Sequence, residues 1–267
     1  MINWTPREPK RNAFMLLSTD HGAMIVNRFD HAIDPKNGNP FGVSIGLMNS
    51  SSFDPDEMNL MIQLLNLKRL LKGNGVVMLD GGANIGAHSL VAGRQMQGWG
   101  QVLAFEAQER LHYCLAGNIA LNNLFNVRAI WKALGQNTTT INIPTPDYLQ
   151  PASFGSLELQ QKDTSEYIGQ DPKTFNYQVV DCITVDSLQL DRLDFFKLDV
   201  EGMEEQVLFG STHTINNCRP IMHIENLKSD HEKLNNILAN FGYVTKQIGP
   251  NTLAVHKDDP ARSHIQW

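Results

Sequence analysis

Short apolar runs that end in an acidic residue recur along this chain and predict the strands of a buried sheet. Runs of this length with little polar interruption are typical of strands that are covered on both faces. A helical pattern follows each run, and this alternation predicts a parallel, doubly wound α/β sheet. The runs with their terminal acids are VVML with Asp80, VLAF with Glu106, and FFKL with Asp199.

Further periodic segments complete the expected domain. Apolar positions three and four residues apart predict helices, whereas alternating positions or continuous apolar runs predict strands. Helices are expected over Ala87–Gln97, Glu109–Leu121 and Met203–Phe209. Additional strands are expected over Val127–Ala133 and Arg219–Glu225, and an antiparallel C-terminal hairpin over Phe241–Lys246 and Thr252–His256.

Residues 1–75 differ in pattern from the rest of the chain. Alternating positions within residues 11–48 predict a small hairpin. A helix follows, for which Asp54 is a good N-cap and Glu57 completes a capping box. We therefore expect an accessory hairpin and helix that pack on a core domain over residues 76–260.

The stretch 136–186 interrupts the alternation of strands and helices. Two strand-like segments within it flank a polar, turn-rich segment, which predicts an antiparallel insertion rather than a linker. Such an insertion would lie near the carboxyl ends of the parallel strands, where ligands bind in this architecture. Phe154 and Ser156 are its best candidates for ligand contact. The alternative is a surface loop without a role in binding.

Composition indicates a soluble enzyme-sized protein. A chain of 267 residues buries roughly three quarters of its unfolded surface, so it needs no disulfide bonds, and its 3 cysteines are too scattered for a metal cluster. The net charge of −6 argues against nucleic-acid and anionic-membrane partners. No apolar run approaches the roughly 20 residues that span a bilayer, and the N-terminus lacks the apolar core of a signal peptide. We expect a cytoplasmic protein, and the sequence is silent on its oligomeric state.

The turn after the first core strand predicts a cofactor site. Residues 80–86 read DGGANIG, in which glycines permit a sharp bend and close approach to a ligand. A nicotinamide fingerprint, G-x-G-x-x-G, has no acid at the start of the turn. Asp80 would repel a pyrophosphate but would suit the cationic amino acid group of S-adenosylmethionine. Glu106, twenty residues after Gly86, is placed to accept hydrogen bonds from both ribose hydroxyls.

Three acids at strand ends are candidates for catalysis. Asp199 and Glu201 follow one strand, and Glu225 ends the next, so all three are expected at the same rim. A carboxylate there would take the proton of an acceptor hydroxyl, an effect typically worth about 10²–10⁴-fold. The alternative is that Asp199 binds the amino group of the cofactor and Glu201 caps the following helix.

Two histidines lie near this rim. His88, in the first turn after the glycines, either touches the carboxylate of the cofactor or helps to cap the helix, and we do not expect it to be the base. His223 alternates with apolar residues in a buried strand, which is typical of a core histidine with a satisfied hydrogen bond.

Over residues 76–226 the chain resembles the FkbM-type S-adenosylmethionine-dependent methyltransferases. The combination of a D-x-G-A-N-x-G turn, a strand ending in F-E and the motif K-L-D-V-E-G is specific to that family. Gly81 stands where the family usually has valine, and Ala107 replaces the proline that commonly follows the acid. The matching segments are LDGGANIGAHS at 79–89, VLAFEA at 102–107, SFGSLEL at 153–159, VDSLQLDRLDFFKLDVEGMEEQVLFG at 185–210 and RPIMHIEN at 219–226.

The resemblance implies a Rossmann-like class I methyltransferase fold and an O-methyltransferase. The donor would be S-adenosylmethionine, with S-adenosylhomocysteine as product, and the acceptor a hydroxyl of a sugar, glycan or secondary metabolite. We expect no metal. The catalytic candidates are Asp199, Glu201 and Glu225. The resemblance and the turn together suggest cofactor contacts from Asp80, Gly81, Gly82, Ala83, Asn84, Gly86, Ser89 and Asp199 on the methionine side, Glu106 at the ribose, Lys132 and Ala133 at the adenine, and a further contact from Ala107.

Two alternatives remain at this point. One is a nicotinamide-dependent oxidoreductase on a similar sheet, which the acid at the start of the turn disfavours. The other is a cofactor-binding module that has lost its chemistry and serves as a partner subunit.

Overall fold

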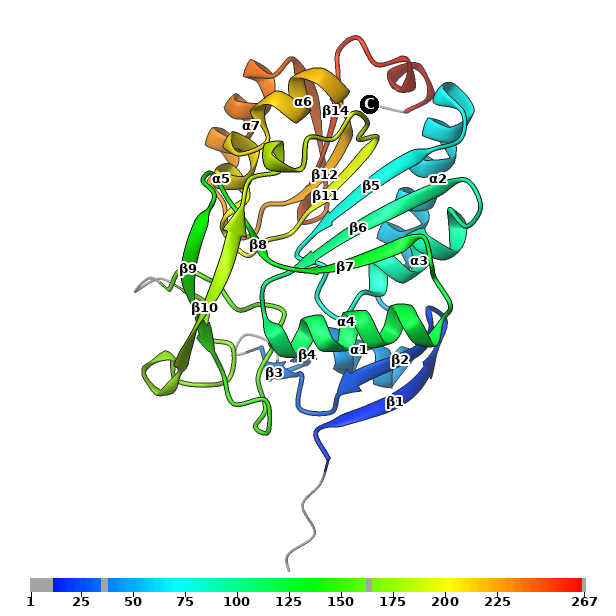
Figure 1. Cartoon of the computed structure of the whole chain (residues 1–267). Helices are drawn as coiled ribbons and strands as arrows, with labels where there is room; N and C mark the ends of the chain where they lie inside the picture. Colours follow the sequence, from blue (N-terminus) through cyan, green and yellow to red (C-terminus); the bar gives the residue numbers. More distant parts are fainter. Residues whose placement is uncertain (1–11, 35–37, 162–164, 266–267) are drawn as a thin grey trace, which may run out of the picture.

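A seven-stranded sheet lies at the centre of the computed structural model, which describes residues 12–34, 38–161 and 165–265 (Figure 1). The strand order is β13-β14-β12-β11-β5-β6-β7, and the five strands from β12 to β7 run parallel. Their bounds are β5 Val76–Gly81, β6 Gly100–Glu106, β7 Val127–Trp131, β11 Phe195–Leu198 and β12 Ile221–Glu225. β13 (Tyr243–Ile248) and β14 (Asn251–His256) add the predicted antiparallel hairpin at one edge. The predicted α/β sheet is thereby confirmed.

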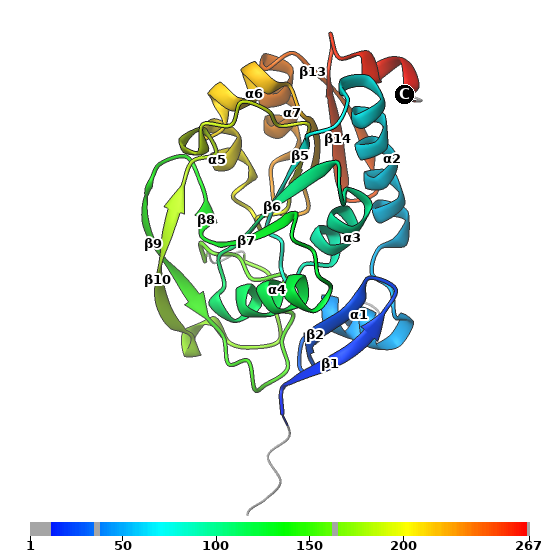
Figure 2. The ribbon, with the colours of Figure 1, turned by 45° about the vertical axis from the view of Figure 1, so that its right-hand side comes forward.

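Helices cover both faces of this sheet, because alternate residues of its strands point to opposite sides. Val76 and Met78 of β5 join one apolar cluster, and Val77 and Leu79 join the other. The first cluster includes α2 (Pro55–Lys72), α3 (Ala87–Gln95) and α4 (Glu109–Leu121), and Figure 2 shows α2 and α3 on that side. The second includes α5 (Glu204–Phe209), α6 (Thr212–Cys218) and α7 (His231–Asn240). None of the helices in the described residues is long and apolar enough to cross a membrane.

The N-terminal hairpin packs on α4, which lies between it and β7 (Figure 1). Two asparagine side chains, Asn118 within α4 and Asn122 just after its last residue, form hydrogen bonds with the backbone of β2. Asn118 accepts from the N–H of Ile25 at 2.5 Å, and Asn122 accepts from the N–H of Ala23 at 3.2 Å. The segment consists of β1 (Phe14–Thr19), β2 (Gly22–Asn27), β3 (Ala32–Ile33), β4 (Pro40–Phe41) and α1 (Val43–Ser50).

The predicted insertion is a small separate sheet in the order β8-β10-β9. β9 (Thr139–Thr145) and β10 (Asn176–Ile183) are antiparallel, as expected. The predicted single strand over 127–133 is wrong, because β7 ends at Trp131 and the chain turns at Lys132. β8 (Ala133–Leu134) therefore leaves the central sheet and pairs with β10, which joins the insertion to the core. The 3₁₀ turns are Pro172–Thr174, Asp186–Leu188 and Pro260–His264.

The start of α2 differs from the predicted capping box. Asp54 has a left-handed backbone (φ 42°), and its side chain makes no capping hydrogen bond. Glu57 does not reach back to the helix start, because its carboxylate contacts polar side chains of three other elements. The first turn of α2 is thus shaped by tertiary contacts rather than by its own cap.

Candidate active site

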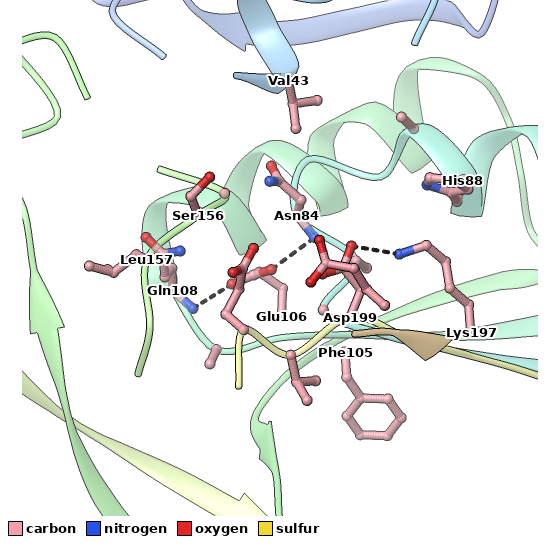
Figure 3. A pocket seen from close by; sticks show the side chains of 18 of the residues that line it. Val43, Asn84, His88, Phe105, Glu106, Gln108, Ser156, Leu157, Lys197 and Asp199 are labelled. Carbon is pink, nitrogen blue, oxygen red and sulfur yellow. Dashed lines mark hydrogen bonds and ion pairs between the residues drawn. The ribbon is translucent and has the colours of Figure 1, made fainter. Parts of the chain in front are cut away.

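A cavity of about 250 Å³ lies at the carboxyl ends of β5, β6, β11 and β12. The N-terminal segment contributes Phe41, Val43 and Phe53 to its wall, and the insertion contributes Ser156 and Leu157. Figure 3 shows Gln108 and Glu106 toward one end and His88 and Lys197 toward the other, with Asp199 between them. The sequence-predicted residues that line the cavity are Gly82, Ala83, Asn84, Glu106, Ala107, Lys132, Ala133, Asp199, Glu201 and Glu225.

The glycine turn is fixed by close packing of two strand ends. Gly82 has φ 79°, and a Cβ there would lie 1.7 Å from the backbone oxygen of Asp199, so only glycine is tolerated. The N–H groups of Gly82 and Ala83 donate to the carbonyl of Phe105 at 3.0 and 2.8 Å. The turn therefore joins β5, β6 and β11 at the floor of the cavity.

Glu106 is held with both carboxylate oxygens in defined positions (Figure 3). The N–H of Asn84 donates to Oε2 at 2.8 Å, and the N–H of Gln108 donates to Oε1 at 2.7 Å. Burial raises the pKa of Glu106 to about 7, although these backbone donors oppose the rise. The carboxylate retains further lone pairs for hydroxyl groups of a ligand in the cavity.

Four sequence-predicted residues lie behind the cavity rather than in its wall. Asp80 is fully buried and accepts from the Ser89 hydroxyl at 2.6 Å. A Cβ on Gly81 would meet Leu134 and Leu198 side chains at 3.1 and 3.2 Å, toward the opposite face of the sheet. Gly86 (φ 96°) turns the chain into α3. These four residues therefore shape the turn and do not line the cavity.

A buried row of charged and polar groups crosses β5, β11 and β12, and its member Lys197 also lines the cavity. Lys197 is paired in register with Asp80 on one side and with His223 on the other. Lys197 Nζ also donates to Asp199 Oδ2 at 3.0 Å. Burial opposes the charge of Lys197, yet Asp199, Asp80 and Glu57 raise its pKa above the ordinary value. Burial lowers the pKa of His223 to about 4, so this histidine is neutral near pH 7.

Glu57 and His88 meet at the edge of this row. His88 Nε2 lies 3.0 Å from Glu57 Oε1, and His223 Nδ1 lies 3.5 Å from the same oxygen. Asn251 donates to Glu57 Oε2 at 3.0 Å. Burial opposes ionisation of Glu57, but His88, Lys197 and His223 outweigh it and hold the pKa of Glu57 well below the usual range.

The turn after β11 presents Glu201 to the cavity. Glu201 and Gly202 both have left-handed backbones (φ 55° and 90°). Glu204 Oε1 accepts from the N–H groups of Val200 and Gly202 at 3.1 and 3.2 Å. The alternative in which Glu201 caps the following helix is therefore wrong, because Glu204 satisfies the turn and leaves Glu201 to the cavity.

Lys228 connects Glu201 to the insertion. Its ammonium lies 2.5 Å from Glu201 Oε2, donates to the carbonyl of Ser156 at 2.6 Å and lies 3.2 Å from Glu166. Burial and Asp199 nevertheless raise the pKa of Glu201 well above its usual value.

Glu225 is the carboxylate with the fewest partners at this rim. Its Oε2 is buried and has no hydrogen-bond partner. Burial, followed by the charges of Asp199 and Glu204, raises the pKa of Glu225 to about 8. This side chain therefore exchanges a proton near neutral pH.

The insertion contributes differently from the prediction. Ser156 lines the cavity, but Phe154 is fully buried in the core and does not. The Phe154 backbone is fixed instead, because its N–H donates to Asp30 at 3.0 Å and its carbonyl accepts from Gln108 at 2.8 Å.

Sequence reasoning missed four polar residues of the site: Glu57, Gln108, Lys197 and Lys228. The lysine inside the apolar run FFKL was a usable signal, because a buried lysine requires acidic neighbours. In the described residues, no group of three or more His, Cys, Asp or Glu side chains is arranged to hold a metal ion.

The sequence was compared with known protein families, and one family matches it. Residues 80–245 match the sequence profile described as "Methyltransferase FkbM domain". Among curated proteins, none matches the sequence.

Several solved structures are similar in part. A methyltransferase FkbM from Methylobacillus flagellatus KT is 19% identical with a TM-score of 0.46, and the match covers 68% of this chain. It covers 44% of the Methylobacillus chain, so the present chain corresponds to less than half of that protein. A SAM-dependent methyltransferase from Aquifex aeolicus is 16% identical with a TM-score of 0.38, over 76% of this chain and 97% of the other.

Proposed function

This chain belongs to the FkbM methyltransferase family, and on that premise we propose that it methylates a hydroxyl group of a sugar, glycan or secondary metabolite. The methyl donor is S-adenosylmethionine, which supplies an electrophilic methyl group on a positively charged sulfur. Transfer is an in-line displacement, so the protein chiefly has to align donor and acceptor and exclude water.

One end of the cavity suits the adenosine part of the donor. Glu106 offers a carboxylate whose position two backbone N–H groups fix, and we assign it to the ribose hydroxyls. Ala107, Lys132 and Ala133 line the adjoining wall and are assigned to the adenine edge. Gly82, Ala83 and Asn84 are assigned to the methionine chain.

The acids that follow β11 and end β12 suit an acceptor hydroxyl. Asp199 is paired with Lys197 and Glu201 with Lys228, so an ammonium already occupies each of these carboxylates. Glu225 lines the cavity with one oxygen unpartnered. We assign the general base to Glu225, because a base works best when its pKa lies near the working pH. Its unpartnered oxygen at the rim is the observation that carries the proposal.

A labelling experiment tests this function. The protein is incubated with methyl-labelled S-adenosylmethionine and fractionated cell extract, and the labelled product is identified by mass spectrometry and NMR. The expected product is a methyl ether of a hydroxyl-rich compound. Label on nitrogen or carbon, with none on oxygen, would contradict the proposal. Asp199→Ala and Glu201→Ala variants that transferred label as well as the wild type would favour a non-catalytic role for these acids.

Family membership disfavours the nicotinamide-dependent oxidoreductase. Equilibrium binding checks this point directly. S-adenosylhomocysteine is expected to bind, and NAD is expected not to bind.

A further inference from the structure

The end of the cavity farthest from Gln108 and Glu106 is built partly by α2, which precedes the family-matching segment 80–245. Glu57 lines this end, and its side chain keeps 18% of its surface exposed. Asn251 donates to Oε2 of Glu57 at 3.0 Å, and His88 Nε2 lies 3.0 Å from Oε1. Glu57 is therefore a carboxylate that the fold orients and leaves open to the cavity.

Asp80, the acid that the sequence suggests for the amino group of the cofactor, does not reach the cavity. It is fully buried, and the Ser89 hydroxyl binds one of its oxygens. Its other oxygen is buried without a hydrogen-bond partner, and its neighbour in register is Lys197, whose charge interacts with it. Asp199, the other acid considered for that group, is already paired with Lys197, so a further acid is needed for an ammonium group above the glycine turn.

The order of groups along the cavity indicates which acid that is. With the ribose at Glu106, a ligand that crosses the turn at Asn84 and Asp199 reaches the end marked by His88 and Lys197 in Figure 3. Glu57 contacts His88 there. The N-terminus of α3 begins beside it at Ala87, and its positive end complements a carboxylate of the same ligand.

The surrounding charges favour a cation at this end. Asp54 also lines the cavity near Glu57, and Asp199 is the next acid along it. Lys197 is the buried cation among these acids, and its ammonium donates to Asp199. His223, whose Nδ1 lies 3.5 Å from Glu57 Oε1, is neutral near pH 7 because its pKa is about 4. Glu57 thus keeps an anionic charge that an incoming ammonium group would balance.

We propose that Glu57 binds the ammonium group of the methionine part of S-adenosylmethionine. This inference rests on the assignment of the ribose to Glu106 made above and on no assumption about the acceptor. It gives the N-terminal segment a direct part in donor binding, beyond its cover of the cavity.

The test compares two ligands by isothermal titration calorimetry. S-adenosylhomocysteine carries the amino acid group, whereas 5′-methylthioadenosine shares the adenosine and lacks that group. Glu57→Gln is expected to weaken S-adenosylhomocysteine about tenfold or more, which is about 1.4 kcal/mol. The affinity for 5′-methylthioadenosine is expected to stay within about twofold, because a lost ammonium contact affects only the ligand that has one.

Three further variants complete the design. Asp56→Asn removes an exposed acid from the same turn of α2 and is expected to change neither affinity. Glu106→Gln is expected to weaken both ligands, and unchanged binding there would reject the ribose assignment separately. Glu57→Asp retains the charge on a shorter side chain. It is expected to lower the ratio of the affinity for S-adenosylhomocysteine to that for 5′-methylthioadenosine, but by less than Glu57→Gln does.

Equal weakening of both ligands by Glu57→Gln would overturn the proposal, because it would indicate a structural role. An unchanged affinity for S-adenosylhomocysteine would overturn it as well. If Glu57→Gln does not fold, the ratio measured for Glu57→Asp decides, and a ratio equal to that of the wild type rejects the proposal.

Discussion

At the scale of a single residue, we predict that Glu106 makes donor binding depend on pH. Its pKa of about 7 means that the carboxylate is protonated below that pH and ionised above it. The ionised form is the stronger hydrogen-bond acceptor for ribose hydroxyls. The affinity for S-adenosylhomocysteine should therefore rise by about tenfold between pH 6 and pH 8, the ratio of ionised fractions for such a group.

Calorimetry of the wild type and Glu106→Gln at both pH values checks this prediction. The variant should bind more weakly at pH 8 and lose the pH dependence, because its amide does not titrate. An equally steep pH dependence in Glu106→Gln would show that another group is responsible.

Glu225 sets the expected pH dependence of the methyl transfer itself. With a pKa of about 8, raised by burial and by Asp199 and Glu204, the basic form grows as the pH rises toward 8. The kcat/KM for the acceptor should rise over this range and level off above it. Glu225→Gln should remove this limb and lower the rate about 10²-fold or more, while S-adenosylhomocysteine binding stays unchanged. A limb that persists in the variant would exclude Glu225 as the base.

The sequence indicates some residues of the site and hides others for a physical reason. Glu106 and Asp199 end apolar strands, so chain order alone brings them to one rim. The local pattern around Glu57 predicts a helix cap. The contacts of Glu57 come from α3, β12 and β14, and their convergence depends on tertiary packing. Its place at the cavity therefore required the structure.

At the scale of elements, Glu204 supports the turn that carries Glu201. It accepts two backbone N–H groups and the hydroxyl of Ser229. Glu204→Ala leaves these donors without their partner, which should lower the free energy of unfolding by about 1–3 kcal/mol. Urea denaturation measures this loss.

Glu205→Ala is the matched control for that measurement. Glu205 is the next residue of α5 and pairs with Lys233, whose side chain is 60% exposed. Pairs of this kind contribute about 0–1 kcal/mol. Equal losses in the two variants would show that the turn does not depend on Glu204.

Element boundaries show the same limit of sequence reasoning. The predicted helix 109–121 coincides with α4, whose apolar face repeats at helical spacing. The predicted strand 127–133 divides at Lys132, although the sequence is continuous in pattern there. The division arises because Ala133 and Leu134 pair with Cys182 and Ile183 of β10, and local pattern carries no information on pairing over such a distance in sequence.

At the scale of the whole molecule, hydrogen bonds join the N-terminal segment to the insertion. Asp30 is buried and accepts from the backbone and hydroxyl of Ser44 at 2.9 and 2.8 Å and from the N–H of Phe154 at 3.0 Å. Lys228 adds the tie between the insertion and Glu201. The site is thus enclosed by chain segments that the central sheet alone does not position. The division at residue 75 stays a prediction.

A buried ion pair fastens the last described turn of the chain to α2. Lys68 Nζ lies 2.5 Å from Asp259 Oδ2, and their side chains are 0% and 4% exposed. Lys68→Met would leave the Asp259 carboxylate buried without a cation, which typically costs about 3–5 kcal/mol. Adding Asp259→Asn should recover most of this loss, because the neutral amide still accepts from the N–H of Ala261.

Urea unfolding of the single and double variants measures both values. Lys72→Met, one turn along α2 and 40% exposed, is the control and should cost less than about 1 kcal/mol, because its partner Asp194 keeps Arg192 at 2.6 Å. If the double variant were as unstable as Lys68→Met, the loss would come from packing around the lysine stem, and the charge on Asp259 would not be its cause.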